Sequence, residues 1–392
     1  MKLRVMELFG GIGACSKAIE RLGIPYEIAD YVEIDKYAVK SFNAIHGTNF
    51  EPQDIKEWDK DIEVDLIMHG SPCQDFSVAG KGAGGDKDSG TRSSLMYETL
   101  RIVEKIKPKY VIWENVKNLL SKKHIHNFEA YQEAMRELGY VNYYQVLNAK
   151  NYGIPQNRER VFTVSIRNDI HNEFVFPEPI PLEKKLKDML EDEVDEKYFI
   201  SDNMMNYFMG VNQKPSKFPR KERFLANINR KNQDIGNSIT TNAGQRPTDN
   251  FVKCPTPLQR EVCNKAIEKK LVTPNDAIEY TFSNARLKEM ENGHIKKQDR
   301  IDNQVMSTLK TNPQQIGVCV GTTKETFGDD QIHIRKLTPK ECWRLMGFDD
   351  SDFEKAEKVN SNAQLYKQAG NSIVANVLEG ILKNLLLKGG GE

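Results

Sequence analysis

Phe9-Gly10-Gly11-Ile12-Gly13 is the most informative part of this chain for its fold class. It follows a short strand-like segment, and the four apolar positions after it share one helical face at i, i+3, i+4 and i+7: Cys15, Ala18, Ile19 and Leu22. Glycines in a turn between a strand and a helix allow the backbone to approach a ligand closely. These residues therefore predict the first strand–turn–helix unit of an α/β fold.

The same alternation continues through residues 1–165. Short apolar segments that read as strands lie at residues 26–32, 64–68, 110–113, 143–147 and 161–164. Amphipathic helices separate several of them, and one of these helices should stop before Pro108. This alternation predicts an α/β fold with a mainly parallel, doubly wound, Rossmann-like sheet.

The composition and periodicity of the sequence change after residues 176–179, which read FPEP. We expect an acidic helix at residues 186–196, followed by a region rich in Asn, Lys, Thr and Pro with weak periodicity. Residues 238–242 resemble residues 307–312, as a repeat or by chance, and both read as β-rich. We predict three domains: residues 1–175, a smaller and mostly β domain at 176–330, and a segment at 331–392 that ends in a helix through 373–387 and packs back on the first.

Composition limits the classes of protein that the chain can represent. It has 392 residues, a formal net charge of zero and six scattered cysteines without a C-x-x-C pair. No structural metal site or disulfide framework is predicted. No apolar run approaches the ~18 residues of a membrane span, and the first residues lack the apolar core of a signal peptide. We therefore expect a cytoplasmic protein without a membrane partner.

Acidic side chains follow two of the predicted strands. Glu33 lies 20 residues after Gly13, where a carboxylate can accept hydrogen bonds from a ribose diol. The glycine turn with this acid favours an adenosine-containing cofactor. The turn is more compact than the G-x-G-x-x-G/A pattern typical of a dinucleotide site, so this cofactor need not carry phosphates. Asp54 and Ile55 form a further acidic–apolar pair that would meet an adenine ring, although Asp54 can equally be an ordinary turn residue.

A cysteine follows another strand, in residues 70–74, which read GSPCQ. A thiol on such a loop is placed at the ligand-binding edge of the sheet, where its thiolate fraction is strongly nucleophilic. Residues 80–85 (GKGAGG) would form either a closing loop or a plain surface connection. Glu114, expected to follow its strand, would donate a proton, and Arg158 and Arg160 would bind a phosphate or a base carbonyl.

Five segments, in this order, resemble the motifs of cytosine-C5 DNA methyltransferases of the bacterial or phage type. They are FGGIG at 9–13, GSPCQ at 70–74, ENV at 114–116, QNRER at 156–160 and QAGNS at 368–372. The resemblance covers residues 1–170 and 330–392, and the region between corresponds to the variable target-recognition region. One departure is Ile34, where the family often has an aromatic residue over the adenine.

The resemblance implies a catalytic set and a cofactor pocket. The catalytic residues would be Cys73, Glu114, Arg158 and Arg160, acting without a metal. The residues that would bind S-adenosyl-L-methionine are Phe9, Gly11, Ile12, Gly13, Glu33, Ile34, Asp54, Ile55, Gly70, Pro72, Leu95, Asn371 and Ser372.

The implied reaction takes place on a cytosine flipped out of a specific double-stranded DNA sequence, because the faces of a stacked base are inaccessible. Cys73 would add to C6, and the methyl group would go to C5. Residues 74–92 would fill the gap in the duplex. Residues 211–231 carry seven basic side chains against one acid and would contact phosphates, unless they are only a solvated surface. Residues 230–330 would read bases.

Three alternatives stay open on the sequence alone. They are an RNA cytosine-C5 methyltransferase of the same fold, a catalytically silent DNA-binding protein, and a dinucleotide oxidoreductase. The expected protein is a cytoplasmic monomer that associates with the nucleoid when bound to DNA. A cognate restriction endonuclease would not be required for its activity. The recognised DNA sequence cannot be read from the chain.

Overall fold

The computed structural model describes residues 2–72, 95–171, 173–208, 219–228, 234–241, 243, 245–246, 249–254 and 333–388. The chain divides into two compact units. Unit 1 comprises Met1–Leu190, Asp234–Asn242 and Pro339–Glu392, and unit 2 comprises Glu191–Gln233 and Ala243–Thr338. These bounds are cut differently from the three domains expected from the sequence, whose limits near 175 and 330 stay a prediction.

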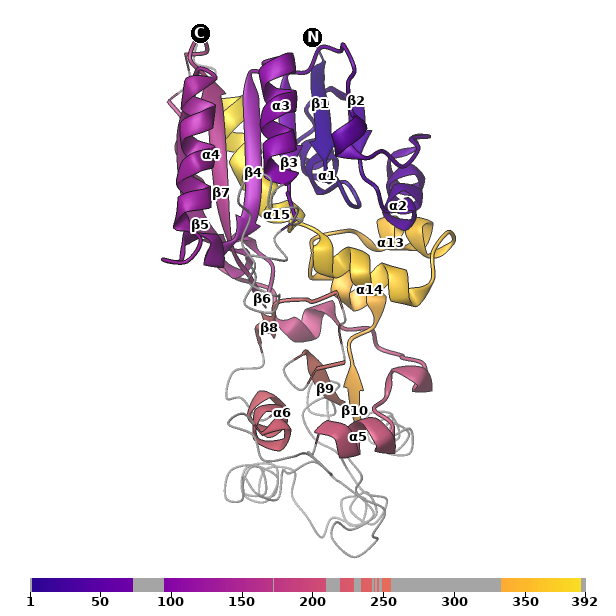
Figure 1. Cartoon of the computed structure of the whole chain (residues 1–392). Helices are drawn as coiled ribbons and strands as arrows, with labels where there is room; N and C mark the ends of the chain where they lie inside the picture. Colours follow the sequence, from indigo (N-terminus) through magenta and orange to yellow (C-terminus); the bar gives the residue numbers. More distant parts are fainter. Residues whose placement is uncertain are drawn as a thin grey trace, which may run out of the picture. The chain divides into compact units, whose positions relative to one another are not determined.

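Unit 1 is built on a six-stranded sheet with the strand order β2-β1-β3-β4-β7-β5 (Figure 1). The strands are β1 (Leu3–Leu8), β2 (Tyr26–Val32), β3 (Leu66–His69), β4 (Tyr110–Val116), β5 (Tyr140–Asn148) and β7 (Glu159–Arg167). The first four pair in parallel, whereas β7 is antiparallel to both β4 and β5. The predicted α/β class with a mainly parallel sheet is confirmed.

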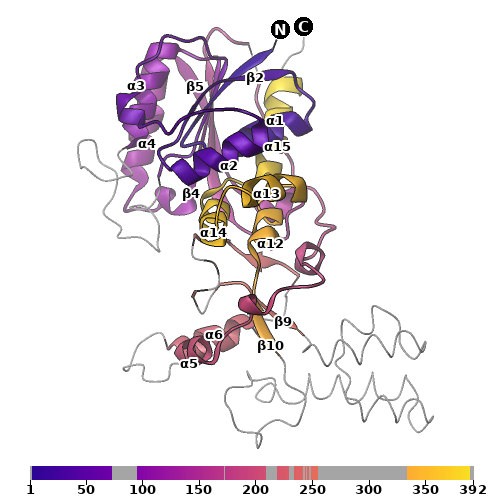
Figure 2. The ribbon, with the colours of Figure 1, turned by 90° about the vertical axis from the view of Figure 1, so that its right-hand side faces the viewer.

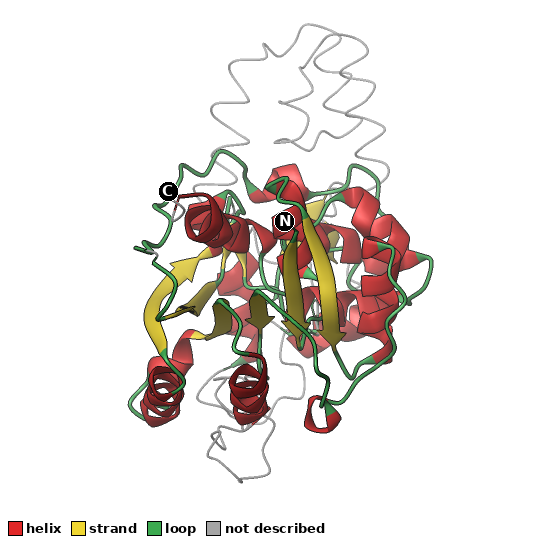
Figure 3. Cartoon of the chain, turned by 90° about the horizontal axis from the view of Figure 1, so that it is seen from above, coloured by secondary structure: helices red, strands yellow, loops and turns green. Residues whose placement is uncertain are grey.

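Helices cover both faces of this sheet (Figure 2). One face carries α1 (Ala14–Arg21) and α15 (Ala375–Lys383), with α2 (Lys36–His46) beside α1; the other face carries α3 (Met96–Ile106) and α4 (Ile125–Glu137). The view from above shows the strands as a layer between helices (Figure 3). A hydrophobic core lies on the α3/α4 face, where alternate strand residues such as Met6, Leu8 and Ile67 are buried.

Helix ends follow the local sequence signals. The helix α1 ends just before Gly23, which adopts φ +65°, as expected for a glycine after a helix. The helix α3 ends at Ile106, and Lys107 takes the left-handed conformation at φ 51° immediately before Pro108. The predicted stop before Pro108 is therefore confirmed, because proline disfavours helical backbone in the residue that precedes it.

The last residues of unit 1 pack on its first helices. They form α12 (Pro339–Arg344), α13 (Asp350–Glu357), α14 (Asn362–Asn371), α15 and a π-helical turn at Asn384–Lys388. Lys17 of α1 is buried and its Nζ lies 2.8 Å from Asp349 and 2.9 Å from Asp352. This buried cation ties α1 to α13, because a buried lysine needs acidic partners to compensate its charge.

The acidic helix expected at residues 186–196 is absent from the described structure, and that prediction is wrong. Two short 3-10 turns stand there, Leu186–Met189 and Glu196–Tyr198. Leu186 and Met189 are buried, whereas the residues between the turns carry several acids. Like charges on neighbouring turns of a helix repel one another, so tertiary burial of two apolar side chains decides the local structure instead.

The described residues of unit 2 contain α5 (Asp202–Phe208), α6 (Arg220–Ile228), β9 (Phe251–Cys254) and β10 (His333–Lys336). The two strands pair antiparallel, and Phe208, Phe224 and Ile334 form a small core. Residues 255–332 lie outside the described residues, so the mostly β character predicted for 176–330 stays a prediction. Residues 307–312, the second copy of the supposed repeat, lie outside the described residues. The first copy adjoins the short strand β8 (Gly236–Asn237) of unit 1, which pairs in parallel with β6 (Gln156–Asn157).

Candidate active site

The parallel strands of unit 1 end at one edge of the sheet. Leu8 at the end of β1 pairs with Val32 of β2 and with His69 of β3, and His69 pairs with Trp113 of β4. Phe9, Glu33 and Gly70 therefore follow their strands at the same level. In open α/β sheets this carboxyl edge is where ligands bind.

The turn after β1 uses left-handed backbone conformations, which glycine adopts without strain. Phe9, Gly11 and Gly13 all have positive φ, at 54°, 56° and 81°. A side chain at Gly13 would collide with the ring of His46, at 2.2 Å, whereas nothing lies within 4 Å of the Cβ position at Gly11. Buried Ile12 and the bond from Tyr31 Oη to the Gly11 carbonyl, 2.7 Å, fix the turn around this open space.

Glu33 borders the same open space. Its carboxylate accepts weakly from the amide of Gly11, 3.3 Å, and from the amide of Asp35, 2.8 Å. Burial raises the pKa of Glu33, and these backbone hydrogen bonds oppose the rise. The neighbouring Ile34 side chain is 68% exposed, an unusual position for a large apolar group. An acceptor, an apolar surface and a glycine cradle together fit an adenosine group.

Other residues implied in the cofactor pocket have structural roles of their own. Asp54 caps the 3-10 turn η1 (Ile55–Glu57) by accepting a hydrogen bond from the amide of Lys56, 3.0 Å. It therefore also fits the alternative of an ordinary turn residue. Ile55 is packed in the hydrophobic core. Leu95 is half-buried and precedes the first residue of α3.

The chain leaves β3 through Gly70, Ser71 and Pro72, the last described residues before the predicted nucleophile. Trp113 Nε1 donates to Ser71 Oγ at 3.0 Å, and Asn115 Nδ2 donates to the Ser71 carbonyl at 3.4 Å. Cys73, the residues 74–92 and the glycine-rich stretch 80–85 lie outside the described residues.

Glu114 lies inside β4 and not after it, which corrects the prediction from the sequence. The strand extends to Val116 because its last residues pair with β7, and Glu114 stands opposite Phe162. Its Oε1 lies 3.0 Å from Nε of Arg160. Burial raises the pKa of Glu114, although the nearby Arg160 and Arg158 act in the opposite direction. A Cβ at Gly70 would lie 3.8 Å from Glu114 Oε2, so the carboxylate adjoins the chain that leads to Cys73.

The two predicted arginines contact different partners. The buried Arg158 donates through Nη1 to Ser238 Oγ and the Ile239 carbonyl, at 3.2 and 3.1 Å. Its Nη2 donates to the carbonyls of Gly370 and Ser372, at 3.2 and 2.8 Å. Arg158 therefore joins residues 238–239 to the end of α14, while Arg160 faces Glu114.

This junction explains two residues to which the sequence alone gave no role. Gln156 accepts from the amide of Ile239, 2.9 Å, and donates to the carbonyl of Leu345, 2.6 Å. At Gly370 a side chain would meet the backbone of Thr240 and Thr241 at 2.3–2.4 Å. Only glycine fits at position 370. The sequence alone does not show this requirement, because it arises when two segments far apart in the chain pack together.

Asn371 and Ser372 end α14. Asn371 is exposed, whereas Ser372 is buried and accepts from Arg158 through its carbonyl. Three further buried polar residues near the strand ends were missed from the sequence: Glu7, His69 and Tyr131. Glu7 had a visible signal, since it is a lone acid in an apolar strand; the others depend on tertiary packing.

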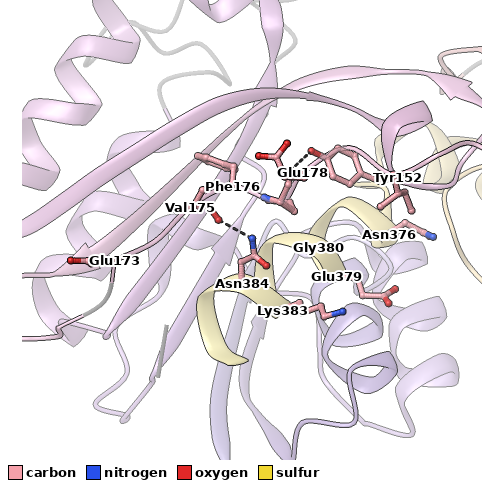
Figure 4. A pocket seen from close by; sticks show the side chains of 12 residues that line it. Tyr152, Glu173, Val175, Phe176, Glu178, Asn376, Glu379, Gly380, Lys383 and Asn384 are labelled. Carbon is pink, nitrogen blue, oxygen red and sulfur yellow. Dashed lines mark hydrogen bonds between the residues drawn. The ribbon is translucent and has the colours of Figure 1, made fainter. Parts of the chain in front are cut away.

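A pocket of about 590 Å³ opens elsewhere on unit 1, between α15, residues 173–180 and Tyr152 of the turn η4 (Ala149–Tyr152) (Figure 4). Tyr152 Oη donates to the Pro177 carbonyl at 2.9 Å, and Asn384 Nδ2 donates to the Val175 carbonyl at 3.0 Å. None of the predicted site residues lines this pocket. It is therefore separate from the candidate active site.

Among the described residues, no group of three or more His, Cys, Asp or Glu side chains is arranged to hold a metal ion. Within the same ranges, no helix has the length and apolar character needed to cross a membrane. Of the basic stretch at 211–231, only residues 219–228 are described; there Lys221 and Arg223 are exposed. Lys214, Lys217, Arg230 and Lys231 lie outside the described residues.

Solved structures with similar folds include a mutant form of DNMT2 from Spodoptera frugiperda, with a TM-score of 0.61 and 19% identity. The match covers 97% of this chain and 99% of that one. A putative DNA modification methyltransferase encoded within an E. coli prophage has a TM-score of 0.53 and 18% identity, over 98% of each chain. These likenesses support the methyltransferase fold of the sheet and its helices.

Sequence relatives span the whole chain. The orphan methyltransferase M.SPRI of Bacillus phage SPR is 33% identical over 98% of both chains. The type II methyltransferase M.HhaI of Haemophilus parahaemolyticus is 30% identical over 98% of this chain and 94% of the relative. The family model described as C-5 cytosine-specific DNA methylase matches residues 3–387. With the five ordered motifs in the sequence, the chain thus belongs to the C-5 cytosine-specific DNA methylases and is a DNA (cytosine-5-)-methyltransferase.

Proposed function

We propose that this methyltransferase uses Cys73 as its nucleophile and S-adenosyl-L-methionine as its methyl donor, on a cytosine flipped out of a specific sequence in double-stranded DNA. The observation that carries the proposal is the position of Glu114. A buried carboxylate with a raised pKa stands beside an arginine and adjoins the chain leading to Cys73. Such a group can donate a hydrogen bond or a proton to a base.

S-adenosyl-L-methionine would supply an electrophilic methyl group at the carboxyl edge of the sheet. The open space at Gly11 would admit it, Glu33 would accept from its ribose hydroxyls, and the exposed Ile34 would contact its adenine. The remaining residues proposed for this pocket are Phe9, Ile12, Gly13, Asp54, Ile55, Gly70, Pro72, Leu95, Asn371 and Ser372. Of these, Ile12, Ile55 and Ser372 are buried, so they would shape the pocket more than touch the ligand.

The chain's own residues would divide the chemistry into feasible steps. The Cys73 thiolate adds to C6 of the cytosine while Glu114 protonates or hydrogen-bonds N3, which makes C5 nucleophilic. Once C5 carries the methyl group, loss of its proton and elimination of the thiolate restore the aromatic ring and release Cys73. Covalent catalysis of this kind replaces one prohibitive step by several smaller ones.

The two arginines would have separate tasks. Arg160, whose Nε lies 3.0 Å from Glu114, would bind the base and steady developing charge. Arg158 donates to four groups of the surrounding chain, so we assign it a positioning task at the junction of β7, residues 238–239 and α14. This differs from the expectation that both arginines bind a phosphate or a base carbonyl.

DNA contacts would come from the less regular parts of the chain. Residues 74–92 would enter the duplex, residues 211–231 would contact phosphates and residues 230–330 would read the bases. The proposed domains are 1–175, 176–330 and 331–392. We propose a cytoplasmic monomer, associated with the nucleoid on DNA. Relatives include both orphan and type II enzymes, and a partner endonuclease would not be needed for methyl transfer. An RNA substrate is less supported, because the matching family acts on DNA.

The test is covalent trapping. A duplex with 5-fluorocytosine at the target, located by bisulfite sequencing of DNA from cells that express the protein, should form a stable adduct with the wild-type enzyme and cofactor. Fluorine cannot leave as a cation, so elimination is blocked. The Cys73→Ala variant should bind cofactor but give neither adduct nor methylation. Normal turnover by that variant would refute the nucleophile, and methylation of cytosine without any trapping of fluorocytosine would refute the covalent scheme.

A further inference from the structure

A buried polar cluster lies outside the catalytic set, at the point where the chain approaches Cys73. It consists of His69, Ser71, Trp113 and Tyr131, all of which are fully or almost fully buried. His69 and Ser71 belong to β3 and the residues after it, Trp113 to β4 and Tyr131 to α4. None of these four residues has a chemical task in the proposed mechanism.

Two side chains of β4 hold both oxygen atoms of Ser71. Trp113 Nε1 donates to the hydroxyl at 3.0 Å, and Asn115 Nδ2 donates to the carbonyl at 3.4 Å. Trp113 and Asn115 are the immediate neighbours of Glu114, and alternate residues of a strand face the same side. The strand that carries the catalytic acid therefore also fixes the residue two positions before the nucleophile.

The indole of Trp113 is itself held in place. Its ring is nearly parallel to that of His69, with an angle of 3° and centroids 5.8 Å apart, and the Tyr131 ring lies 4.1 Å away. His69 Nε2 and Tyr131 Oη are 3.0 Å apart. Burial lowers the pKa of His69 to about 3, so this pair is a neutral hydrogen bond at physiological pH. A neutral, closely packed support of this kind restricts the indole N–H to one direction.

We propose that Trp113, through its hydrogen bond to Ser71, is a positioning residue for the addition of Cys73 to the base. The inference rests on the proposed function, in which Cys73 attacks while Glu114 contacts the base. Pro72 separates Ser71 from Cys73, and the fixed φ of proline makes this link stiff. A small displacement of Ser71 is therefore passed on to residue 73, and reactions between held groups are sensitive to shifts of about 1 Å.

The experiment measures adduct formation in a single turnover with 5-fluorocytosine DNA and saturating S-adenosyl-L-methionine. Trp113→Phe keeps the aromatic ring but removes the N–H donor, and Ser71→Ala removes its acceptor. Each variant should slow adduct formation about tenfold, the effect of losing ~1.4 kcal/mol of transition-state stabilisation. The double variant should also be slowed about tenfold, because both changes remove the same bond. Dissociation constants for cofactor and DNA should stay within about twofold of the wild type, because neither Trp113 nor Ser71 is among the residues proposed to contact these ligands.

Trp343→Phe is the matched control. Trp343 is fully buried, and its indole N–H also donates over 3.0 Å, to the carbonyl of Leu365. This variant should lose stability but keep the wild-type rate of adduct formation. If Trp113→Phe is too unstable to assay, the smaller Ser71→Ala change tests the same bond alone.

The outcomes separate the two proposals. No adduct with the wild-type enzyme, despite methylation of normal DNA, would refute the proposed function itself. A wild-type adduct with unchanged rates in both single variants would overturn the positioning role of Trp113. So would a double variant slowed about a hundredfold, since independent effects multiply, and so would equal slowing by Trp343→Phe.

Discussion

The Nε atom of Arg160 lies 3.0 Å from Oε1 of Glu114 across the antiparallel pair β7 and β4. Arg160 stands opposite Val116, two residues along the strand from Glu114, so both side chains are on the same face of the sheet. The cation therefore lowers the pKa of the buried acid, against the effect of burial. Arg158 lies on the same segment of chain but is committed to a different set of partners, so the two arginines can be tested apart.

Glu114→Gln should reduce the single-turnover rate of methyl transfer by about two to four orders of magnitude, the usual size of a general-acid contribution. Glutamine preserves the shape of the side chain but cannot give up a proton. Rapid-quench assays with labelled cofactor measure the rate. As a control, Glu159→Gln removes an acid that pairs with Lys117 at 3.0 Å on the exposed surface, and its rate should be unchanged. A Glu114→Gln enzyme as fast as the wild type would exclude Glu114 as the proton donor.

Arg160→Gln should shift the pH dependence of the rate. Burial raises the pKa of Glu114, and Arg160 is the first of the charges that lower it. Activity that needs the protonated acid is lost as the pH rises through that pKa. Without the arginine the pKa of Glu114 rises further, so the alkaline limb of the single-turnover profile should move to higher pH, at a lower maximal rate. A limb that moves to lower pH would contradict the assignment.

Arg158→Lys should destabilise the protein by ~2–4 kcal/mol, as measured by urea unfolding, because lysine cannot donate to four groups in two directions. The groups left without their donor would be on Ser238, Ile239, Gly370 and Ser372. Arg160→Lys should cost less, under ~2 kcal/mol, because it alters one pair and lysine keeps a positive charge beside Glu114. Equal stabilities of the two variants would argue against Arg158 as a junction.

Gly370→Ala should also destabilise the junction, by ~2 kcal/mol or more, because its Cβ would lie 2.3 Å from the backbone nitrogen of Thr241. Gly380→Ala is the control. Its Cβ would meet only side chains at 3.2 Å or more, and alanine favours the helix α15, so its stability should remain within ~1 kcal/mol of the wild type. Urea unfolding at neutral pH compares them, and a neutral Gly370→Ala would disprove the close approach.

Glu7→Gln should flatten the pH dependence of stability. Burial raises the pKa of Glu7 from 4.5 to about 7, against the hydrogen bonds from Ser16. The folded state holds this proton more tightly than the unfolded state does. The stability that Glu7 contributes is therefore complete below pH 4.5 and is lost as the pH rises through about 7. Glutamine retains an acceptor for the Ser16 amide but has no proton to lose.

The measurement for Glu7 is urea unfolding at about pH 5 and about pH 8, on either side of the raised pKa. The free energy of unfolding of the wild type should fall relative to that of the Glu7→Gln variant between these two values. Taking the difference between the two proteins removes the contribution of His69, whose lowered pKa acts in the opposite direction, with stability lost as the pH falls below 6.5. A constant difference would mean that Glu7 ionises normally.

Neutralising the basic side chains of 211–231 should weaken DNA binding and reduce its dependence on salt. Each phosphate contact that is removed should lower the slope of log K against log[salt] by ~0.9. The binding titrations would be repeated at several salt concentrations. Lys56→Gln serves as a charge control, because Lys56 is an exposed residue of the turn η1 in unit 1. An unchanged slope would identify the stretch as solvated surface.

The succession of strands along the chain and the places of the motifs were readable from the residues alone. Residues 26–32 were predicted as a strand and form β2 with the same bounds, since apolar patterning reflects a structure that is set locally by burial of one face. The placement of Glu33 directly after that strand was equally readable. The acidic stretch at 186–196 was misread because helical propensity there is overridden by the burial of Leu186 and Met189.

What the motif side chains contact depends on how the chain packs. The two arginines of the QNRER motif read alike in the sequence, yet Arg158 meets residues 80 and 212 positions away while Arg160 meets Glu114. Glu114 itself belongs to β4 because β7 pairs alongside it. Local periodicity depends on near neighbours, whereas hydrogen bonds between distant segments exist only once packing brings them together, and no pattern along the chain encodes them.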